Sequence, residues 1–244
     1  MTNQKKEIIA KNIAPMINDG DFVNLGVGIP TMVSNFVPKD KTVFLHAENG
    51  AAGLAGRLGY EGIFDDSDTF LRWEKEHKGE KSDCYSGHKD MLDAGSDPSL
   101  LMKGACCFDI CTSFAMLRGG HLNMTVLGAM QVDREGSLAN WMIPGNMVTG
   151  MGGAMDILAG TKNVIVAMSM TTADGSPKIL EKCTLPLTAH SCVTKIVTEK
   201  CIIKCSGGGE LIVEAIYPGI SKAEIVECCG AKLIFAQEIV TMLP

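Results

Sequence analysis

One carboxylate of the chain stands in a setting that suits nucleophilic chemistry. Glu48 follows the short apolar run Thr42-Val43-Phe44-Leu45 and is followed at once by Asn49-Gly50. The apolar, partly β-branched run predicts a buried strand, whereas the Asn-Gly pair and the later glycines predict a loop. A carboxylate carried from a strand end into a turn of small residues can be aimed at an electrophile. A solvated turn glutamate is the alternative, because such turns are common.

A glycine loop precedes this turn in the chain. Gly26-Val27-Gly28 follows a predicted strand over 22–25, and Pro30 fits the first turn of the next helix, where its missing N–H costs nothing. A strand, a glycine loop and a helix in this order aim backbone N–H groups and the positive end of a helix at an anion. We therefore expect a phosphate or a carboxylate to bind at Gly26 and Gly28, with a purely structural turn as the alternative.

A second glycine-rich segment, Gly150-Met151-Gly152-Gly153-Ala154, comes before an apolar run over 155–158. Glycines allow the backbone to approach a ligand closely, so the N–H groups of this segment suit the stabilisation of an oxyanion. A glycine-rich helix start is the other interpretation, and it is the favoured one when the segment is considered alone.

The remaining pattern predicts an α/β fold. Ile9, Ile13, Met16 and Ile17 recur at helical spacing, and apolar strands are expected at 22–25, 42–45, 124–127, 164–168, 201–203, 211–214 and 233–235. Nearly continuous apolar strands separated by helical stretches favour an open, mostly parallel sheet with helices on both faces. Functional groups collect at the carboxyl ends of such strands, where Glu48 and the Gly26–Gly28 loop both fall.

Composition limits the classes of function. A chain of 244 residues with 46% hydrophobic content predicts one α/β domain over 1–244, and a net charge of −6 argues against a nucleic-acid partner. The ten cysteines contain no Cys-x-x-Cys pair, so we expect reduced core thiols and no zinc site. No apolar stretch reaches the ~18 residues of a membrane span, and the polar N-terminal stretch has no signal segment, so we expect a cytoplasmic protein.

Taken together, the segments resemble the β subunit of family I CoA-transferases. The resemblance rests on the Glu48, Gly26–Gly28 and Gly150–Ala154 segments and on three further runs: Ser113-Phe114-Ala115-Met116-Leu117-Arg118-Gly119-Gly120-His121, Leu127-Gly128-Ala129-Met130-Gln131-Val132 and Leu138-Ala139-Asn140-Trp141-Met142-Ile143-Pro144-Gly145. It extends over residues 3–56 and 104–200 and is closest to the 3-oxoacid (acetoacetate) transferases, whose partner acid is succinate, acetate or butyrate.

The resemblance implies a fold shared with sugar-phosphate isomerases and a ping-pong exchange of CoA through a glutamyl-CoA thioester on Glu48. It requires neither a metal nor another cofactor, since the acyl-CoA thioester is itself a substrate. The implied site residues are Glu48 as nucleophile, Gly153 and Ala154 as oxyanion donors, Asn24 as a group that binds substrate or positions Glu48, Asn49 and Gly50 as residues that shape the loop, and Gly26 and Gly28 at the CoA. Strand-end capping is the alternative for Asn24. Asn49 and Gly50 are expected to shape the loop because both residue types tolerate left-handed backbone.

The family's α subunit would supply the second half of the site, so we expect a hetero-oligomer that binds an acyl-CoA and a short-chain carboxylic acid. Two departures stand out: Ala47 replaces a common serine, and an insertion near 57–103 has no counterpart. We hypothesise that the insertion alters acid specificity or the subunit contact, with a solvated excursion as the alternative. Two other functions stay open, namely an acyl-CoA hydrolase on the same scaffold and a noncatalytic ligand-binding or assembly subunit.

Overall fold

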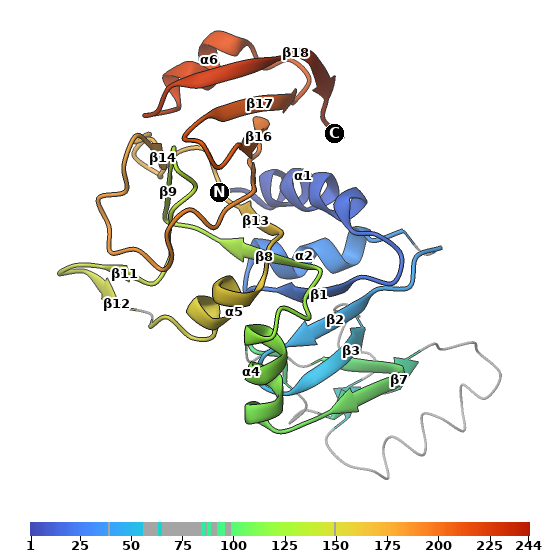
Figure 1. Cartoon of the computed structure of the whole chain (residues 1–244). Helices are drawn as coiled ribbons and strands as arrows, with labels where there is room; N and C mark the ends of the chain where they lie inside the picture. Colours follow the sequence, from blue (N-terminus) through green and yellow to red (C-terminus); the bar gives the residue numbers. More distant parts are fainter. Residues whose placement is uncertain are drawn as a thin grey trace.

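A computed structural model describes residues 1–38, 40–55, 63–64, 84–85, 87–88, 92–95, 99–148 and 150–244 (Figure 1). The predicted insertion near 57–103 lies largely outside the described residues. A single domain over 1–244 and the role of the insertion therefore stay predictions.

The main sheet has eleven strands in the described part of the chain, in the order β18-β17-β16-β15-β13-β8-β1-β2-β3-β7-β5. In chain order these are β1 (Phe22–Leu25), β2 (Phe44–Ala47), β3 (Ala51–Ala55), β5 (Cys84–Tyr85), β7 (Leu100–Cys107), β8 (Met124–Gly128), β13 (Val164–Ala167), β15 (Lys195–Val197), β16 (Cys201–Cys205), β17 (Leu211–Ile216) and β18 (Leu233–Thr241). Three small sheets pair β9 (Gln131–Asp133) with β10 (Leu138–Ala139) and β14 (Ile179–Leu180), β11 (Met142–Ile143) with β12 (Met147–Val148), and β4 (Ile63–Phe64) with β6 (Gly87–His88).

The five central strands β15, β13, β8, β1 and β2 run parallel. Antiparallel strands extend this centre on both sides, through β3 and β7 at one side and through β16 and β17 at the other. The carboxyl ends of β1, β2 and β8 consequently meet at one edge of the sheet, which is where open α/β sheets place their functional groups.

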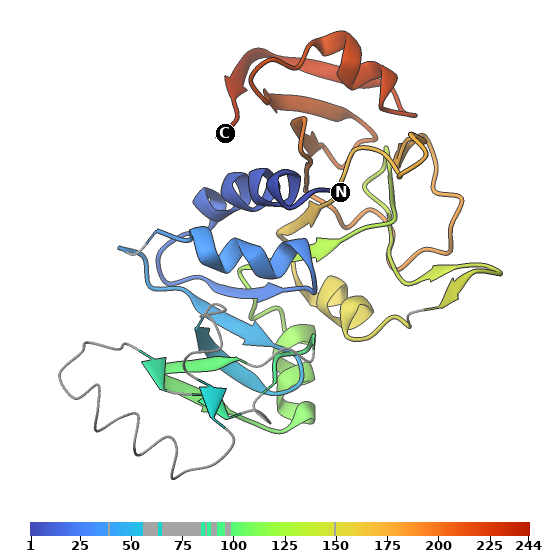
Figure 2. The same cartoon turned by 180° about the vertical axis from the view of Figure 1, so that it is seen from behind.

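Helices cover both faces, as predicted (Figures 1 and 2). The described helices are α1 (Asn3–Ile13), α2 (Ile29–Met32), α4 (Ile110–Arg118), α5 (Ala154–Gly160) and α6 (Lys222–Glu227), with short 3-10 turns at Ala14–Met16 and Val33–Phe36. Along β13 the side chains alternate: Ile165 joins the core cluster that contains Ile9 of α1, whereas Val164 joins the cluster that contains Leu158 of α5. The α/β architecture follows from this alternation, because each face of the sheet needs an apolar cover.

Most strand predictions are confirmed. β1 has the predicted bounds, and five later strands begin at the predicted residue. β2 begins at Phe44 instead of Thr42. The prediction of a loop over the glycines after Asn49 is wrong, because Ala51–Ala55 forms β3 against β7. Gly53 permits this pairing at φ +85°, since a Cβ there would lie 2.9 Å from the Cβ of Ala105.

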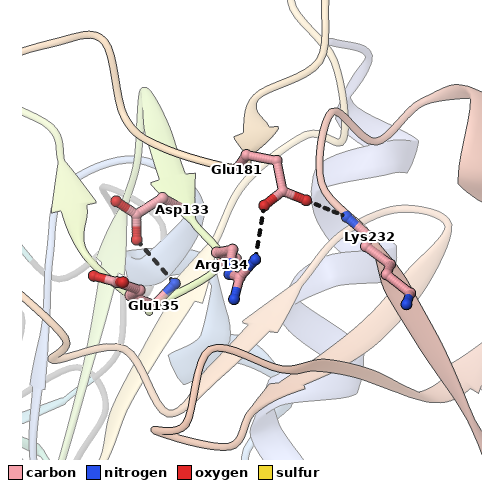
Figure 3. A network of polar contacts seen from close by, with 5 residues as sticks. All are labelled: Asp133, Arg134, Glu135, Glu181 and Lys232. Carbon is pink, nitrogen blue, oxygen red and sulfur yellow. Dashed lines mark hydrogen bonds and ion pairs between the residues drawn. The ribbon is translucent and has the colours of Figure 1, made fainter.

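A polar network joins the small β9–β14 sheet to the C-terminal strands. Figure 3 shows Glu181 between Arg134 and Lys232, with Arg134 Nη1 donating to Glu181 Oε2 at 3.2 Å and the Lys232 N–H donating to Glu181 Oε1 at 2.9 Å. Asp133, which is buried, accepts from the N–H groups of Glu135 at 3.1 Å and Ser137 at 2.9 Å. Asp133 therefore holds the turn that follows β9, while Glu181 links two exposed segments.

The prediction that the thiols lie in the core is confirmed in part. Cys201 and Cys205 are buried, and burial raises the pKa of each to about 12. Cys106 and Cys107 on β7 and Cys111 on α4 are exposed. None of the described helices is long and apolar enough to span a membrane.

Candidate active site

A tight turn between β2 and β3 carries Glu48. The N–H of Gly50 donates to the carbonyl of Ala47 at 3.0 Å, so Glu48 and Asn49 occupy the two central positions of the turn. Gly50 has φ +126°, and a Cβ there would collide with the carbonyl of Phe108. The carbonyl of Gly50 in turn accepts from the N–H of Phe108 at 3.0 Å. A glycine at position 50 thus lets the turn close against the segment that enters α4.

Asn49 shapes the turn in a way that the sequence did not predict. Among the described residues only Ser191 combines a side chain with positive φ, so Asn49 does not adopt left-handed backbone. Its side chain instead donates from Nδ2 to the carbonyl of Leu92 at 2.8 Å. Asn49 therefore ties the turn to the segment over 92–95.

Asn24 lies directly beneath the carboxylate. Its strand β1 pairs in parallel with β2, and the register places Asn24 beside His46. Asn24 Nδ2 donates to Glu48 Oε2 at 3.2 Å and to the carbonyl of His46 at 3.3 Å, and the residue is fully buried. The side chain therefore contacts Glu48 and at the same time satisfies a backbone carbonyl near the end of β2, so both interpretations of Asn24 stay open.

Three further buried polar residues are linked to Asn24, either directly or through His46. The Thr125 hydroxyl on β8 is 3.3 Å from Asn24 Oδ1, and His46 Nε2 is 3.1 Å from the hydroxyl of Ser113 on α4. Asn24, His46, Ser113 and Thr125 are each at most 2% exposed, and we call these four residues the buried polar layer. Motif reasoning missed all but Asn24. The alternation of side chains along strands carries the signal, since Asn24 and His46 are polar residues within apolar strands.

His46 is held as a neutral imidazole. Its ring lies 5.2 Å from the ring of Phe22, edge-on, and 6.1 Å from the ring of Phe108, stacked. Burial lowers the pKa of His46 from its ordinary value of 6.5 to about 4. Its Nδ1 has no hydrogen-bond partner among the described residues. An uncharged ring at this position leaves Glu48 without a cationic neighbour from the buried polar layer.

Gly153 packs against the carboxylate from the other side. A Cβ on Gly153 would lie 3.0 Å from Glu48 Cγ and 3.4 Å from Glu48 Oε1. Gly153 precedes α5, and an ion pair of 2.7 Å between Arg118 and Asp156 joins α5 to α4. Within the described part of the chain the N–H of Gly153 has no hydrogen-bond partner. The backbone of Gly153 therefore lies against the side chain of Glu48.

Ala154 differs from the expectation for an oxyanion donor. Its N–H donates to the carbonyl of Met151 at 3.1 Å, as part of the turn that begins α5. Of the two predicted donors, the structure brings Gly153 to Glu48 with an N–H that has no partner among the described residues, whereas the N–H of Ala154 is already engaged.

The Gly26–Gly28 loop also divides into two parts. The N–H of Gly26 donates to the carbonyl of Val126 at 2.8 Å, and a Cβ there would lie 3.1 Å from Leu127 Cδ2, so Gly26 serves the close packing of β1 and β8. Gly28 has φ +93° and open space around it, and it caps a helix of only four residues. The predicted anion contact can therefore involve Gly28 in this conformation, but the N–H of Gly26 is occupied.

Two cavities lie near this edge of the sheet. One of about 40 Å³ lies beneath the Gly26–Gly28 loop, with Leu25, Thr31 and Ala47 among its lining residues. The other, of about 670 Å³, is lined by residues that follow β8, β13 and β15, including Lys178 and Glu199. Glu48 lines neither cavity. No group of three or more His, Cys, Asp or Glu side chains in the described ranges is placed to hold a metal ion.

This arrangement presents one half-buried carboxylate with an amide donor on one side and a glycine backbone on the other. A model of the coenzyme A transferase family matches residues 88–228. The chain is also 41% identical over 209 residues to the acetate CoA-transferase subunit beta of Escherichia coli K12, which covers 86% of this chain and 84% of that protein. The chain belongs to the coenzyme A transferase family. This membership confirms the predicted resemblance to CoA-transferases, which rested on the sequence motifs.

Other CoA-transferases differ in length. The human mitochondrial succinyl-CoA:3-ketoacid coenzyme A transferase 2 is 40% identical over 223 residues, which are 91% of this chain but 38% of the human protein. The crystal structure of the acyl-CoA transferase YdiF apoenzyme from Escherichia coli O157:H7 matches 99% of this chain with a TM-score of 0.69 and 17% identity, and this chain spans 44% of that chain. At this identity the structural match supports the fold alone.

Proposed function

We propose that this CoA-transferase chain carries the nucleophile, and that Glu48 accepts the acyl group and then CoA. The observation that carries the proposal is the setting of the Glu48 carboxylate, which is 3.2 Å from Asn24 Nδ2 and is packed against Gly153. A carboxylate needs only aim and partial desolvation for this chemistry, because carboxylates are ionised near neutral pH.

The proposed exchange passes through two covalent intermediates on Glu48. A carboxylate oxygen of Glu48 attacks the thioester carbonyl of an acyl-CoA, the C–S bond of the tetrahedral intermediate breaks, and CoA leaves as a thiolate while a mixed anhydride remains on Glu48. The thiolate attacks the glutamyl carbonyl, which releases the free acid and leaves a glutamyl-CoA thioester. A second carboxylate reverses both steps and leaves as its own CoA ester, so the kinetics are ping-pong. No cofactor beyond the CoA thioester enters this proposal.

The site residues take distinct roles in the proposal. Each tetrahedral intermediate carries an oxyanion, and we assign its donor to the N–H of Gly153, which packs against Glu48 and has no partner among the described residues. Ala154 joins it only when its contact with Met151 opens. Asn24 holds the carboxylate, and Asn49 and Gly50 hold the turn. CoA lies along the Gly26–Gly28 loop, where Gly28 offers open backbone and Gly26 supports packing.

The proposed substrates are short-chain acids, with acetoacetate or another 3-oxoacid exchanged against succinate, acetate or butyrate. The names of the relatives support this class, since one is an acetate CoA-transferase subunit and another a succinyl-CoA:3-ketoacid transferase. The choice among these acids depends on pocket walls, where one methylene is worth only about 1–3 kcal/mol. A cytoplasmic location stays a prediction.

An α subunit completes the site in this proposal. Two observations support it: the relative from Escherichia coli is named a subunit beta, and this chain matches only 38% of the human protein. Glu48 is only half-buried among the described residues, so part of its side chain is left for a partner to cover in this proposal. We expect the isolated chain to be inactive and the hetero-oligomer to be active.

Intact mass spectrometry tests the assignment of Glu48. The chain, co-expressed with its α-type partner, is incubated with acetoacetyl-CoA, acetyl-CoA or butyryl-CoA without an acceptor acid. We expect a CoA adduct on this chain that Glu48→Ala and Glu48→Gln both lack. If no acyl-CoA yields an adduct and added acids produce no turnover, the assignment is wrong and a noncatalytic binding subunit replaces it.

The same preparation separates a transferase from a hydrolase. CoA exchange that requires the second acid indicates a transferase. Steady release of free CoA at a rate that is independent of acid indicates that water resolves the thioester, and this result would replace the transferase with an acyl-CoA hydrolase.

A further inference from the structure

Thr125 is a buried hydroxyl with unusual partners. The residue is fully buried on β8, and the register of β1 and β8 places it beside Asn24. Its Oγ1 lies 3.3 Å from Oδ1 and 3.4 Å from the backbone carbonyl of Asn24. Both described partners of this hydroxyl are therefore oxygens of the residue that contacts Glu48. A buried hydroxyl normally has a partner, and here that partner is Asn24 alone.

The orientation of the Asn24 amide determines what Glu48 meets. In the observed orientation the NH₂ end faces two acceptors, Glu48 Oε2 and the carbonyl of His46, while the oxygen end faces the Thr125 hydroxyl. A flipped amide would direct its oxygen at the carboxylate and at the carbonyl, and neither of them can donate. The two acceptors thus set the orientation in which Asn24 donates to Glu48. The Thr125 hydroxyl, which can give its one proton to either oxygen of Asn24, is the donor within reach of the amide oxygen among the described residues.

We propose that Thr125 is a positioning residue of the transferase, which fixes the amide of Asn24 and through it the carboxylate of Glu48. The inference rests on the proposed role of Glu48. Thr125 itself is separated from Glu48 by the side chain of Asn24, so it acts through Asn24. The hydrogen bonds of 3.2–3.4 Å are long, as is common in free enzymes whose contacts tighten when substrate binds.

Thr125→Val keeps the shape of the side chain and removes the hydroxyl. The buried oxygen of Asn24 then has no donor, and the amide gains freedom to turn away from Glu48. Losing one such hydrogen bond corresponds to about a tenfold slower step when the bond acts only in positioning the reacting group. We expect adduct formation on Glu48 to slow about tenfold while the affinity for acyl-CoA stays unchanged. Thr125→Ser keeps the hydroxyl and should react within about threefold of the wild type.

The test uses the hetero-oligomer in single-turnover experiments, with the rate of CoA-adduct formation read by quenched-flow mass spectrometry and acyl-CoA binding measured separately. A double-mutant cycle compares Thr125→Val in the wild type and in Asn24→Ala. We expect no further slowing in the Asn24→Ala background, because the residue through which Thr125 acts is gone. Thr125→Ala serves as a second hydroxyl-free variant if the valine variant does not fold.

Three results would overturn the inference. They are an unchanged rate in the folded hydroxyl-free variants, an equal loss in Thr125→Ser, and the same loss in both backgrounds of the cycle. A failure of the proposed function looks different, since the wild type itself would then form no adduct. If Thr125 served only the stability of the fold, Thr125→Val would lower the unfolding temperature. The rate of adduct formation and the affinity for acyl-CoA would then change together.

Discussion

Glu48 and Gly153 meet where a larger side chain would displace the carboxylate. A Cβ on Gly153 would lie 3.0 Å from Glu48 Cγ, which is closer than ordinary packing allows. We expect Gly153→Ala to move the carboxylate and slow adduct formation by about tenfold to a hundredfold, since misplacement by about 1 Å can cost a hundredfold in rate. Quenched-flow mass spectrometry of the hetero-oligomer measures this.

Gly128→Ala is the matched control for that substitution. Gly128 ends β8 near the same edge of the sheet, has no positive φ, and has no atom within 4 Å of the position of a Cβ. A similar loss of rate in both variants would contradict the steric explanation, because only Gly153 abuts Glu48.

His46 makes stability depend on pH. In the unfolded chain His46 takes up a proton as the pH falls through about 6.5, whereas burial lowers its pKa in the folded chain to about 4. Stability is therefore complete above about pH 6.5 and declines as the pH falls toward 4, by at most about 3 kcal/mol. Urea unfolding at several pH values measures this decline. His46→Gln should remove this part of the pH dependence, and an equally steep decline in that variant would assign it to other groups.

At single residues, the sequence predicted which residues approach Glu48 better than how they do so. Asn24 and Gly153 do lie beside it, because strand ends and glycine segments converge at one edge. The free or occupied state of an N–H was not predictable, since it depends on partners far along the chain. Gly26 bonds to Val126, and Thr125 and Ser113 contribute side chains that the motifs did not assign to this site.

Among the elements, the β2–β3 hairpin depends most on one position. Gly50 combines φ +126° with a close approach to the carbonyl of Phe108. We expect Gly50→Ala to destabilise the fold by at least about 2 kcal/mol, because the cost of the strained backbone and the cost of the collision with Phe108 add. Denaturant unfolding of the chain monitors this loss.

Gly145→Ala provides the comparison for the hairpin. Gly145 has φ +75° but open space around the position of a Cβ, so the substitution isolates the cost of left-handed backbone. We expect about 1–2 kcal/mol. Equal losses in the two variants would show that the contact with Phe108 adds nothing.

The hairpin also contains β3, the strand that the sequence predicted as a loop. Ala51–Ala55 contains small residues and a glycine, which favour a loop, yet it pairs with β7 because Gly53 permits a close approach to Ala105. Propensity along one segment carries no information about the partner strand. The parallel centre was predictable, since its strands are apolar on both faces.

For the whole molecule, the turn after β9 carries contacts that link the small β9–β14 sheet to Lys232, directly before the start of β18 (Figure 3). Asp133 is buried and accepts from two N–H groups of this turn, and Cys183 N–H is a third donor at 3.4 Å. We expect Asp133→Ala to cost about 1–3 kcal/mol, since buried donors lose their acceptor. Glu181→Ala should have little effect, because Glu181 is exposed and its ion pair with Arg134 is solvated.

Urea unfolding of the two variants against the wild type makes this comparison. A loss in Glu181→Ala that equals the loss in Asp133→Ala would mean that the exposed bridge contributes as much to the free energy of unfolding as the buried turn, which would contradict the prediction.

The groups around Glu48 come from distant parts of the chain, with Thr125 lying 101 residues after Asn24. Contacts of such long sequence separation form late in folding, because the loop between them must close first. No short fragment can hold Asn24, Glu48, Thr125 and Gly153 in place together. The capacity to form the adduct should therefore return last during refolding, after helical signals and compaction have recovered.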